Sequence, residues 1–267
     1  MTADDARRVT SARIVAAHEA IADVVRRTPV LPSATLTEIA GTEVWLKAEN
    51  LQRTGSFKIR GALAKLAALG DECRSGVICA SAGNHAQAVA LAAREREIPC
   101  EVVMPIGAPV GKVEATEALG AAVTLAGGSV IEAIAVAEQR VAETGLSFVH
   151  PFDDADVICG QGTLGLELLE QLPDAATVLV PAGGGGLLAG VAVALKSARP
   201  GVRVVGVQTD AVPALARSIE AGAVEHVDAR PTIADGIAVG APSALTLELT
   251  TRWADGCVTV TDDEIAD

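Results

Sequence analysis

Lys58 is the residue of this sequence with the clearest capacity for covalent chemistry. It lies near the start of the amphipathic run 57–69, which predicts a helix with Ser56 as its N-cap. The first turn of a helix carries partial positive charge, which disfavours an ammonium group and lowers the pKa of a lysine there. A neutral lysine amine is the nucleophile that Schiff-base chemistry requires. Because most lysines at helix starts are solvated surface charges, the interpretation depends on two other loops.

Four consecutive glycines form the first of these loops. Gly183, Gly184, Gly185 and Gly186 follow the apolar run 177–181 and precede a helical pattern that starts at Leu187. Glycines let backbone N–H groups approach an anion closely, and a helix N-terminus adds favourable polarity. The loop therefore predicts a phosphate site, the alternative being a tight strand-to-helix turn without a ligand.

The glycine loop also fits a competing pattern. Residues 184–189 satisfy G-x-G-x-x-A, the fingerprint of dinucleotide-binding folds. That fingerprint needs an acidic residue about 20 positions on, at the end of the next strand, to hold a ribose hydroxyl. The next predicted strand ends in Gln208, and Asp210 comes two residues later. A nicotinamide-dependent dehydrogenase is therefore a poor match, and the Walker pattern fails because no Lys-Ser/Thr follows the glycines.

The second loop is Ser81, Ala82, Gly83, Asn84 and His85, between the apolar run 76–80 and a predicted helix. Its small residues and free N–H groups at a helix start suit a carboxylate, and Asn84 can donate to a ring oxygen. His85 either carries a proton or shapes the loop. An amino acid bound to a phosphorylated aldehyde cofactor would use the lysine, the phosphate loop, the carboxylate loop and the amide together.

The elements that must position these residues alternate between strands and helices. Predicted strands are 43–47, 76–80, 101–104, 122–125, 147–150, 177–181, 202–208 and 257–260, and predicted helices are 12–25, 57–69, 84–96, 111–119, 130–144, 158–171, 187–198, 212–221 and 245–254. This order predicts an α/β fold with a mainly parallel sheet covered on both faces. Ligands of such folds bind beyond the carboxyl ends of the strands, where the loops described above lie.

Composition excludes several classes of partner. The net charge of −13 argues against nucleic acid and anionic membranes, and no stretch of 18 apolar residues predicts a membrane span. The polar, acidic N-terminus is unlike a secretory signal. The five cysteines have no metal-type spacing and are expected to be mostly buried, reduced thiols of a cytoplasmic protein. Cys159 lies near a glycine segment, but we do not expect it to be catalytic.

Six segments together resemble the fold-type II pyridoxal-phosphate enzymes of the threonine dehydratase (threonine ammonia-lyase) and serine racemase family. The matching segments, in the family's order, are 49–62, 81–87, 150–154, 160–163, 181–188 and 232–236. They extend over nearly the whole chain, and as a set they are far more specific than a single glycine loop.

The resemblance implies pyridoxal 5'-phosphate as cofactor, with Lys58 forming the Schiff base and later removing the Cα proton. It implies that Asn84 contacts the 3' oxygen of the cofactor, and that Gly183, Gly184, Gly185, Gly186 and Leu187 hold its phosphate. Ser81, Ala82, Gly83, Asn84 and His85 would bind the substrate carboxylate. The implied fold is tryptophan synthase beta-like, with two doubly wound, mainly parallel subdomains. Residues 1–68 and 154–267 would form the large domain, and residues 69–153 the small mobile one.

The resemblance also implies the reaction, β-elimination from L-threonine or L-serine to a 2-oxo acid and ammonia. Racemases of this family have a serine at the position of Ala82, and a methyl group cannot move a proton, so elimination is favoured over racemisation. The metal-dependent members have carboxylates where this chain has Gln208 and Ala214, so no metal is expected there. One methyl group contributes only about 1–3 kcal/mol to discrimination, which leaves threonine and serine as alternatives.

The C-terminal segment departs from the family pattern. Thr261 and Glu264 form a capping box, yet the sequence stops at Asp267. The resemblance implies further helices and a strand that supplies the partner of the pyridine nitrogen, so we expect a C-terminally truncated fold without a regulatory domain. A weakly active or non-catalytic cofactor-binding relative is the alternative function. A homo-oligomer, dimer or tetramer, is expected from the resemblance.

Overall fold

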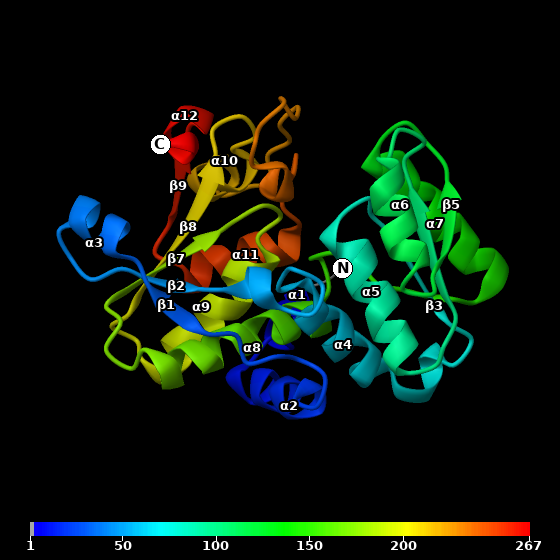
Figure 1. Ribbon diagram of the computed structural model, residues 1–267, viewed down its shortest axis with the longest axis horizontal. Coiled ribbons are helices and arrows are strands. Elements are labelled where there is room, and N and C mark those ends of the chain that lie inside the picture. Colours follow the sequence, from blue (N-terminus) through cyan, green and yellow to red (C-terminus); the bar gives the residue numbers. More distant parts are fainter. Residues whose placement is uncertain (1–2) are drawn as a thin grey trace.

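The structure, a computed structural model, describes residues 3–267 (Figure 1). The helices are α1 (Ala3–Arg7), α2 (Ser11–Ile21), α3 (Ala34–Ala40), α4 (Lys58–Leu69), α5 (Asn84–Glu95), α6 (Val110–Glu117), α7 (Val130–Thr144), α8 (Ala155–Gln171), α9 (Gly186–Ala198), α10 (Ala214–Ala221), α11 (Ala244–Trp253) and α12 (Asp262–Ala266). The strands are β1 (Val30–Pro32), β2 (Trp45–Lys47), β3 (Val77–Ala80), β4 (Cys100–Met104), β5 (Ala122–Leu125), β6 (Ser147–Phe148), β7 (Thr177–Pro181), β8 (Arg203–Thr209) and β9 (Cys257–Val260).

Two parallel sheets organise the chain. One has the order β5-β4-β3-β6 and the other the order β7-β8-β9, while β1 and β2 form a short antiparallel pair. The predicted α/β class with mainly parallel sheets is therefore confirmed. Strand β1 was not predicted, because three residues that end in a proline give no periodic signal. The predicted strand 147–150 is shorter than expected, since the chain leaves the sheet after Phe148.

Three helices stack closely because glycines line their contacts. A Cβ atom added to Gly160 of α8 would lie 2.5 Å from the Arg60 carbonyl oxygen of α4. One added to Gly190 of α9 would lie 2.4 Å from the Ile158 carbonyl oxygen of α8. Both distances are shorter than any real Cβ contact, so glycine alone lets these backbones approach this closely. The α4–α8–α9 stack thus connects the helix of Lys58, through α8, to the helix that starts at Gly186.

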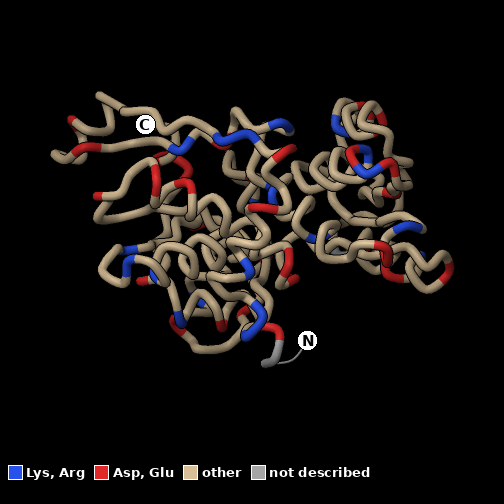
Figure 2. Tube along the Cα trace, turned by 90° about the horizontal axis from the view of Figure 1, so that it is seen from below, with Lys and Arg blue, Asp and Glu red and all other residues tan. Residues whose placement is uncertain are grey.

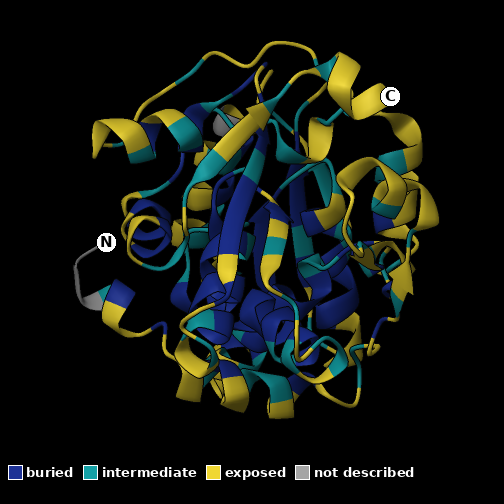
Figure 3. Cartoon of the chain, turned by 90° about the vertical axis from the view of Figure 1, so that its left-hand side faces the viewer, coloured by how far each residue is buried: buried dark blue, intermediate teal, exposed yellow. Residues whose placement is uncertain are grey.

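Burial and charge are distributed differently over the molecule. Figure 3 shows that buried residues concentrate in the central strands and helices, whereas the outer helices are exposed. Lysines and arginines are scattered among acidic residues over both lobes, without a continuous basic stripe (Figure 2).

Four of the five cysteines, Cys73, Cys79, Cys100 and Cys159, are buried free thiols, as expected. Within residues 3–267 no helix combines the length and apolarity needed to cross a membrane.

The two sheets lie in two lobes (Figure 1). The β5-β4-β3-β6 sheet is built from residues within the expected small domain, and the β7-β8-β9 sheet follows it in the chain. The chain passes between the lobes after α4 and again before α8. The domain boundaries at 68/69 and 153/154 stay a prediction.

Candidate active site

Lys58 is the first residue of α4, and its side chain is partly buried. Its Nζ donates a hydrogen bond of 2.8 Å to the Pro151 carbonyl oxygen. No carboxylate pairs with this amine among the residues that the structure describes. Burial lowers the pKa of Lys58 to about 8, from its ordinary value of 10.5. About a tenth of this lysine is therefore unprotonated at pH 7, compared with less than about a thousandth for an ordinary lysine.

The predicted N-cap of α4 is wrong. Phe57 occupies the N-cap position with helical dihedral angles (φ −61°, ψ −18°), so the backbone has no extended residue from which a side chain could cap the helix. The hydroxyl group of Ser56 is instead buried without a hydrogen-bond partner among the described residues, as is that of Thr54. Two unpaired hydroxyl groups thus precede Lys58.

A turn that follows β6 connects Lys58 with the glycine loop. The Nδ1 atom of His150 accepts hydrogen bonds from the backbone N–H groups of Phe152 (3.3 Å) and Asp153 (2.7 Å). Pro151, inside this turn, presents the carbonyl that binds Lys58. The ring of Phe152 lies against Gly184, where an added Cβ atom would come within 2.7 Å of it. The segment 150–153 therefore lies between the lysine and the four glycines.

The four glycines connect β7 to α9 and leave the start of α9 uncapped. Gly185, the N-cap residue, has a φ of 89°, which favours glycine, and no side chain caps the helix. A Cβ atom on Gly183 would lie 2.9 Å from Val239 and 3.2 Å from Ile237, so this position has no room for a side chain. Free N–H groups at a helix N-terminus are suited to bind phosphate.

The Ser81–His85 loop connects β3 to α5. The Ser81 hydroxyl accepts the Gly83 N–H at 3.1 Å, which shapes the turn, and Asn84 is exposed at the start of α5. His85 is buried, and its Nε2 lies 2.8 Å from the Val149 carbonyl oxygen. Burial, together with the nearby charge of Lys58, lowers the pKa of His85 to about 3. A neutral ring bonded to the backbone favours the loop-shaping role over the proton carrier.

Gln208, one of the two positions compared with metal ligands, has structural partners. Its side chain donates to the Gly183 carbonyl oxygen at 3.3 Å. Its Oε1 accepts the N–H groups of Leu215 and Ala216, both at 3.1 Å, at the start of α10. The amide thus holds the glycine loop to α10, which also starts with the other position, Ala214.

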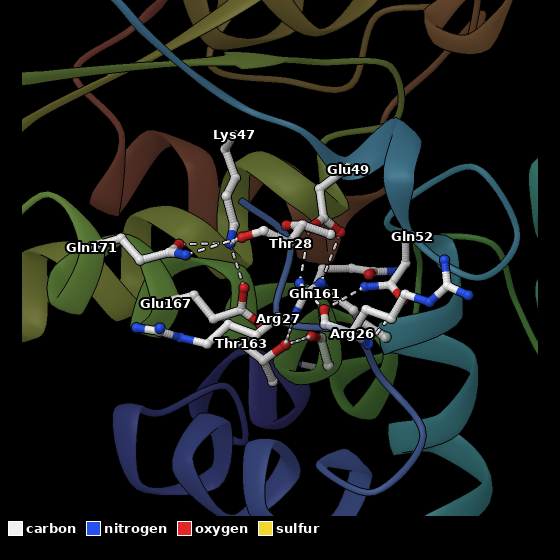
Figure 4. Close-up of polar contacts among 12 residues, drawn as sticks. Arg26, Arg27, Thr28, Lys47, Glu49, Gln52, Gln161, Thr163, Glu167 and Gln171 are labelled. Carbon is white, nitrogen blue, oxygen red and sulfur yellow. Dashed lines mark hydrogen bonds and ion pairs between the residues drawn. The ribbon is translucent and has the colours of Figure 1, made fainter. Parts of the chain in front are cut away.

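Two residues after Lys58, Arg60 belongs to a buried ionic network that the sequence did not reveal; Figure 4 shows its members Lys47, Glu49 and Glu167. Arg60 is fully buried and pairs with Glu49 through two hydrogen bonds of 2.8 Å and with Glu167 at 2.6 Å. Its remaining donors reach Thr163 Oγ1 and the Arg26 carbonyl oxygen. Glu167 also pairs with Lys47. Every nitrogen of the Arg60 guanidinium thereby has a partner, which fixes the first turn of α4.

The charges of this network support one another. Burial opposes ionisation of Arg60 and Glu167, but their mutual hydrogen bonds outweigh it, raising the pKa of Arg60 and lowering that of Glu167. The sequence offered no signal for this pairing, because Glu49 lies 11 residues before Arg60, outside its helix, and Glu167 lies 107 residues after it. The Pro151 carbonyl was also missed, since a backbone acceptor has no sequence signature.

The site fits the cofactor that the resemblance implies. The buried amine of Lys58 suits an aldehyde, and the uncapped, glycine-lined start of α9 suits a phosphate. Unpaired buried atoms, Ser56 Oγ and His85 Nδ1, remain available near the lysine. The structure therefore brings Lys58, the Ser81–His85 loop and the glycine loop to one place, through contacts with the segment 149–153.

Comparisons with known proteins show which family the chain resembles. Residues 21–267 match the family described as "Pyridoxal-phosphate dependent enzyme". The L-threonine ammonia-lyase of Thermotoga maritima is 51% identical over 260 residues, which are 97% of this chain and 65% of that protein. The structure of maize serine racemase is similar with a TM-score of 0.94 and 37% identity, over 97% of this chain and 79% of that one. For the processed threonine deaminase isoform 2 of Solanum lycopersicum the TM-score is 0.92 with 36% identity, over 100% of this chain and 73% of that one.

Proposed function

The chain belongs to the pyridoxal-phosphate dependent enzyme family, and we propose on this premise that it catalyses β-elimination from L-threonine or L-serine, yielding a 2-oxo acid and ammonia. The observation that carries the proposal is the partly buried amine of Lys58, with a pKa lowered to about 8, beside a glycine-lined helix start. The chain spans 65% of the length of the Thermotoga maritima relative, so the activity of the whole relative is proposed here for this chain.

Each part of the site has a role in this proposal. The N–H groups from Gly183 to Leu187 bind the phosphate of the cofactor, and Lys58 carries its aldehyde end. The Ser81–His85 loop binds the substrate carboxylate, and Asn84 contacts the 3' oxygen. When bound, pyridoxal phosphate supplies an aldehyde that joins amines and a ring that accepts the electron pair released at Cα.

Lys58 also moves the proton in the proposed reaction. Its unprotonated amine takes the proton from Cα of the substrate, which a pKa near 8 permits close to neutral pH. With L-threonine the net products are 2-oxobutanoate and ammonia, and with L-serine they are pyruvate and ammonia.

Ala82 supports elimination rather than racemisation. Racemisation requires a second acid or base on the opposite face of the substrate. The loop that binds the carboxylate has a methyl group at this position, which can neither donate nor accept a proton. Proton transfer therefore takes place on the lysine side alone.

The proposal includes a small domain, residues 69–153, that closes on a large domain formed by residues 1–68 and 154–267. One contact between them supports closure over the glycine loop. Lys112 of α6 lies 3.7 Å from Asp235, in the segment whose Ile237 covers Gly183. The proposal also includes a cytoplasmic location and assembly into a homo-oligomer, either a dimer or a tetramer. Light scattering of the purified chain tests the oligomeric state.

A 2-oxo acid assay with L-threonine, L-serine and D-serine tests the function. The purified chain, supplied with pyridoxal phosphate, is expected to show a visible absorption band and to release 2-oxo acid from the L-amino acids. Lys58→Ala should lose both, whereas Lys196→Ala, a lysine on α9 paired with Asp255, should keep both. A band without 2-oxo acid would identify a non-catalytic cofactor-binding relative. Absence of the band would overturn the proposal, and heat protection by NAD alone would favour the dehydrogenase alternative.

A further inference from the structure

We propose that His150 is a positioning residue, whose side chain shapes a turn that holds the Lys58 amine whenever this amine is not covalently bound. The proposal rests on the function proposed above and extends it to a residue outside the two loops and the lysine. It starts from one contact, the 2.8 Å hydrogen bond from Lys58 Nζ to the Pro151 carbonyl oxygen.

The direction of this carbonyl depends on the His150 side chain. Two successive backbone N–H groups, of Phe152 and Asp153, donate to Nδ1, which closes the turn around Pro151. An Nδ1 atom that accepts two hydrogen bonds carries no proton, so the ring must be neutral with its proton on Nε2. Burial lowers the pKa of His150 and favours this neutral form.

Contacts on both sides fix the turn in space. Before it, the Val149 N–H donates to the Ile78 carbonyl oxygen of β3 at 2.9 Å, and the Val149 carbonyl oxygen binds His85. The ring of Phe152 packs edge-on against that of His150, with centroids 4.9 Å apart, and lies on Gly184. The Pro151 carbonyl therefore has a defined place between the Ser81–His85 loop and the glycine loop.

The Pro151 carbonyl stabilises the released Lys58 amine when an amino acid displaces this lysine from the cofactor. The incoming neutral amine forms a bond to the cofactor carbon and the bond from that carbon to Lys58 breaks. One proton passes from the incoming nitrogen to Lys58, which leaves as a neutral amine. One N–H of this amine then binds Pro151, which leaves the lone pair free to accept the Cα proton. A hydrogen bond of this kind contributes about 0.5–1.5 kcal/mol, or about 2- to 10-fold in the displacement equilibrium.

Two substitutions separate this role from general packing. His150→Leu retains much of the side-chain volume but has no acceptor. His150→Asn retains an acceptor, because asparagine side chains accept backbone N–H groups two residues on. The measurement is a spectral titration of the cofactor-loaded protein with L-alanine, which has no β-leaving group, so the readout is binding and not turnover.

We expect His150→Leu to bind L-alanine about 2- to 10-fold more weakly than the wild type, with an unchanged cofactor band, and His150→Asn to restore binding to within about twofold. Equal affinity of wild type and His150→Leu would overturn the proposal, as would an equal loss in both variants. If His150→Leu does not fold, His150→Ala and His150→Ser provide the same comparison without and with an acceptor. A wild-type chain without the band would instead refute the proposed function itself.

Discussion

Lys58 and Arg60 are two cations in the first turn of α4 with opposite surroundings. Arg60 is bound by two carboxylates, whereas the amine of Lys58 has a single neutral carbonyl. The pKa of the arginine is raised and that of the lysine is lowered. The comparison teaches that a buried cation at this helix end stays charged where carboxylates pair with it. Where no carboxylate pairs with it, burial makes it a base.

Breaking the network around Arg60 should have the largest effect. Glu167→Gln leaves the buried guanidinium without one of its two carboxylates, and Lys47 loses its carboxylate partner while it keeps the Thr28 carbonyl and Gln171 Oε1. Removing one partner of a buried ion pair typically costs about 3–5 kcal/mol, which we expect as the loss in the free energy of unfolding, measured with urea.

Glu170→Gln is the matched control, because Glu170 lies on the same helix and pairs with Arg27 at the surface. Exposed pairs contribute about 0–1 kcal/mol, so this variant should unfold nearly like the wild type. Similar losses in both variants would show that burial does not distinguish the two pairs.

Replacing Lys58 should have a smaller effect of the opposite sign. Its pKa is about 8 in the folded protein and 10.5 ordinarily, so between these pH values the unfolded chain binds more protons. Stability of the wild type therefore rises with pH across this window, by at most about 3 kcal/mol relative to Lys58→Met. Urea unfolding of both proteins without cofactor, at about pH 8 and about pH 10.5, measures the difference. If the stabilities of the wild type and of Lys58→Met changed with pH in the same way, the Lys58 amine would have to be charged in the folded protein.

A methyl group on the glycine loop tests the contact between this loop and Phe152. A Cβ atom at Gly184 would come within 2.7 Å of the Phe152 ring, and overpacking of this size costs about 1–3 kcal/mol. Gly184→Ala should lower the melting temperature and weaken binding of pyridoxal phosphate, measured by its absorption. Gly201→Ala, with no atom near the added methyl group, should change neither. Unchanged cofactor binding in Gly184→Ala would argue against this loop as the phosphate site.

The smallest expected effect concerns the contact between the lobes. Lys112→Ala removes an exposed ion pair with Asp235, which contributes at most about 1 kcal/mol, so KM should rise by no more than about fivefold. High salt should abolish the difference from the wild type, because it screens exposed charges. Arg74→Ala, which removes an exposed pair within one lobe, should leave KM unchanged. A salt-independent effect would contradict the ionic origin.

Periodicity predicted most elements of this fold, but it failed where side-chain hydrogen bonds replace regular structure. The strand expected over 147–150 ends at Phe148, because His150 closes a turn with the N–H groups of Phe152 and Asp153. Ser56 has a residue type that is typical of N-caps, yet the chain enters α4 through the helical Phe57. In both cases residue types at fixed spacing did not specify the local dihedral angles.

The sequence by itself determined the local chemistry, which is the lysine at a helix start and the glycine and carboxylate loops after apolar strands. These follow from spacing, because strand-to-helix connections leave N–H groups free wherever they occur. Only the tertiary structure decided the protonation of the two cations of α4. Arg60 remains charged because Glu49, from the segment before α4, and Glu167, from α8, both reach it. Lys58 loses its proton more easily because it is buried and no carboxylate of residues 3–267 pairs with it. A pKa depends on burial and on neighbouring charges in space, and folding alone brings these together.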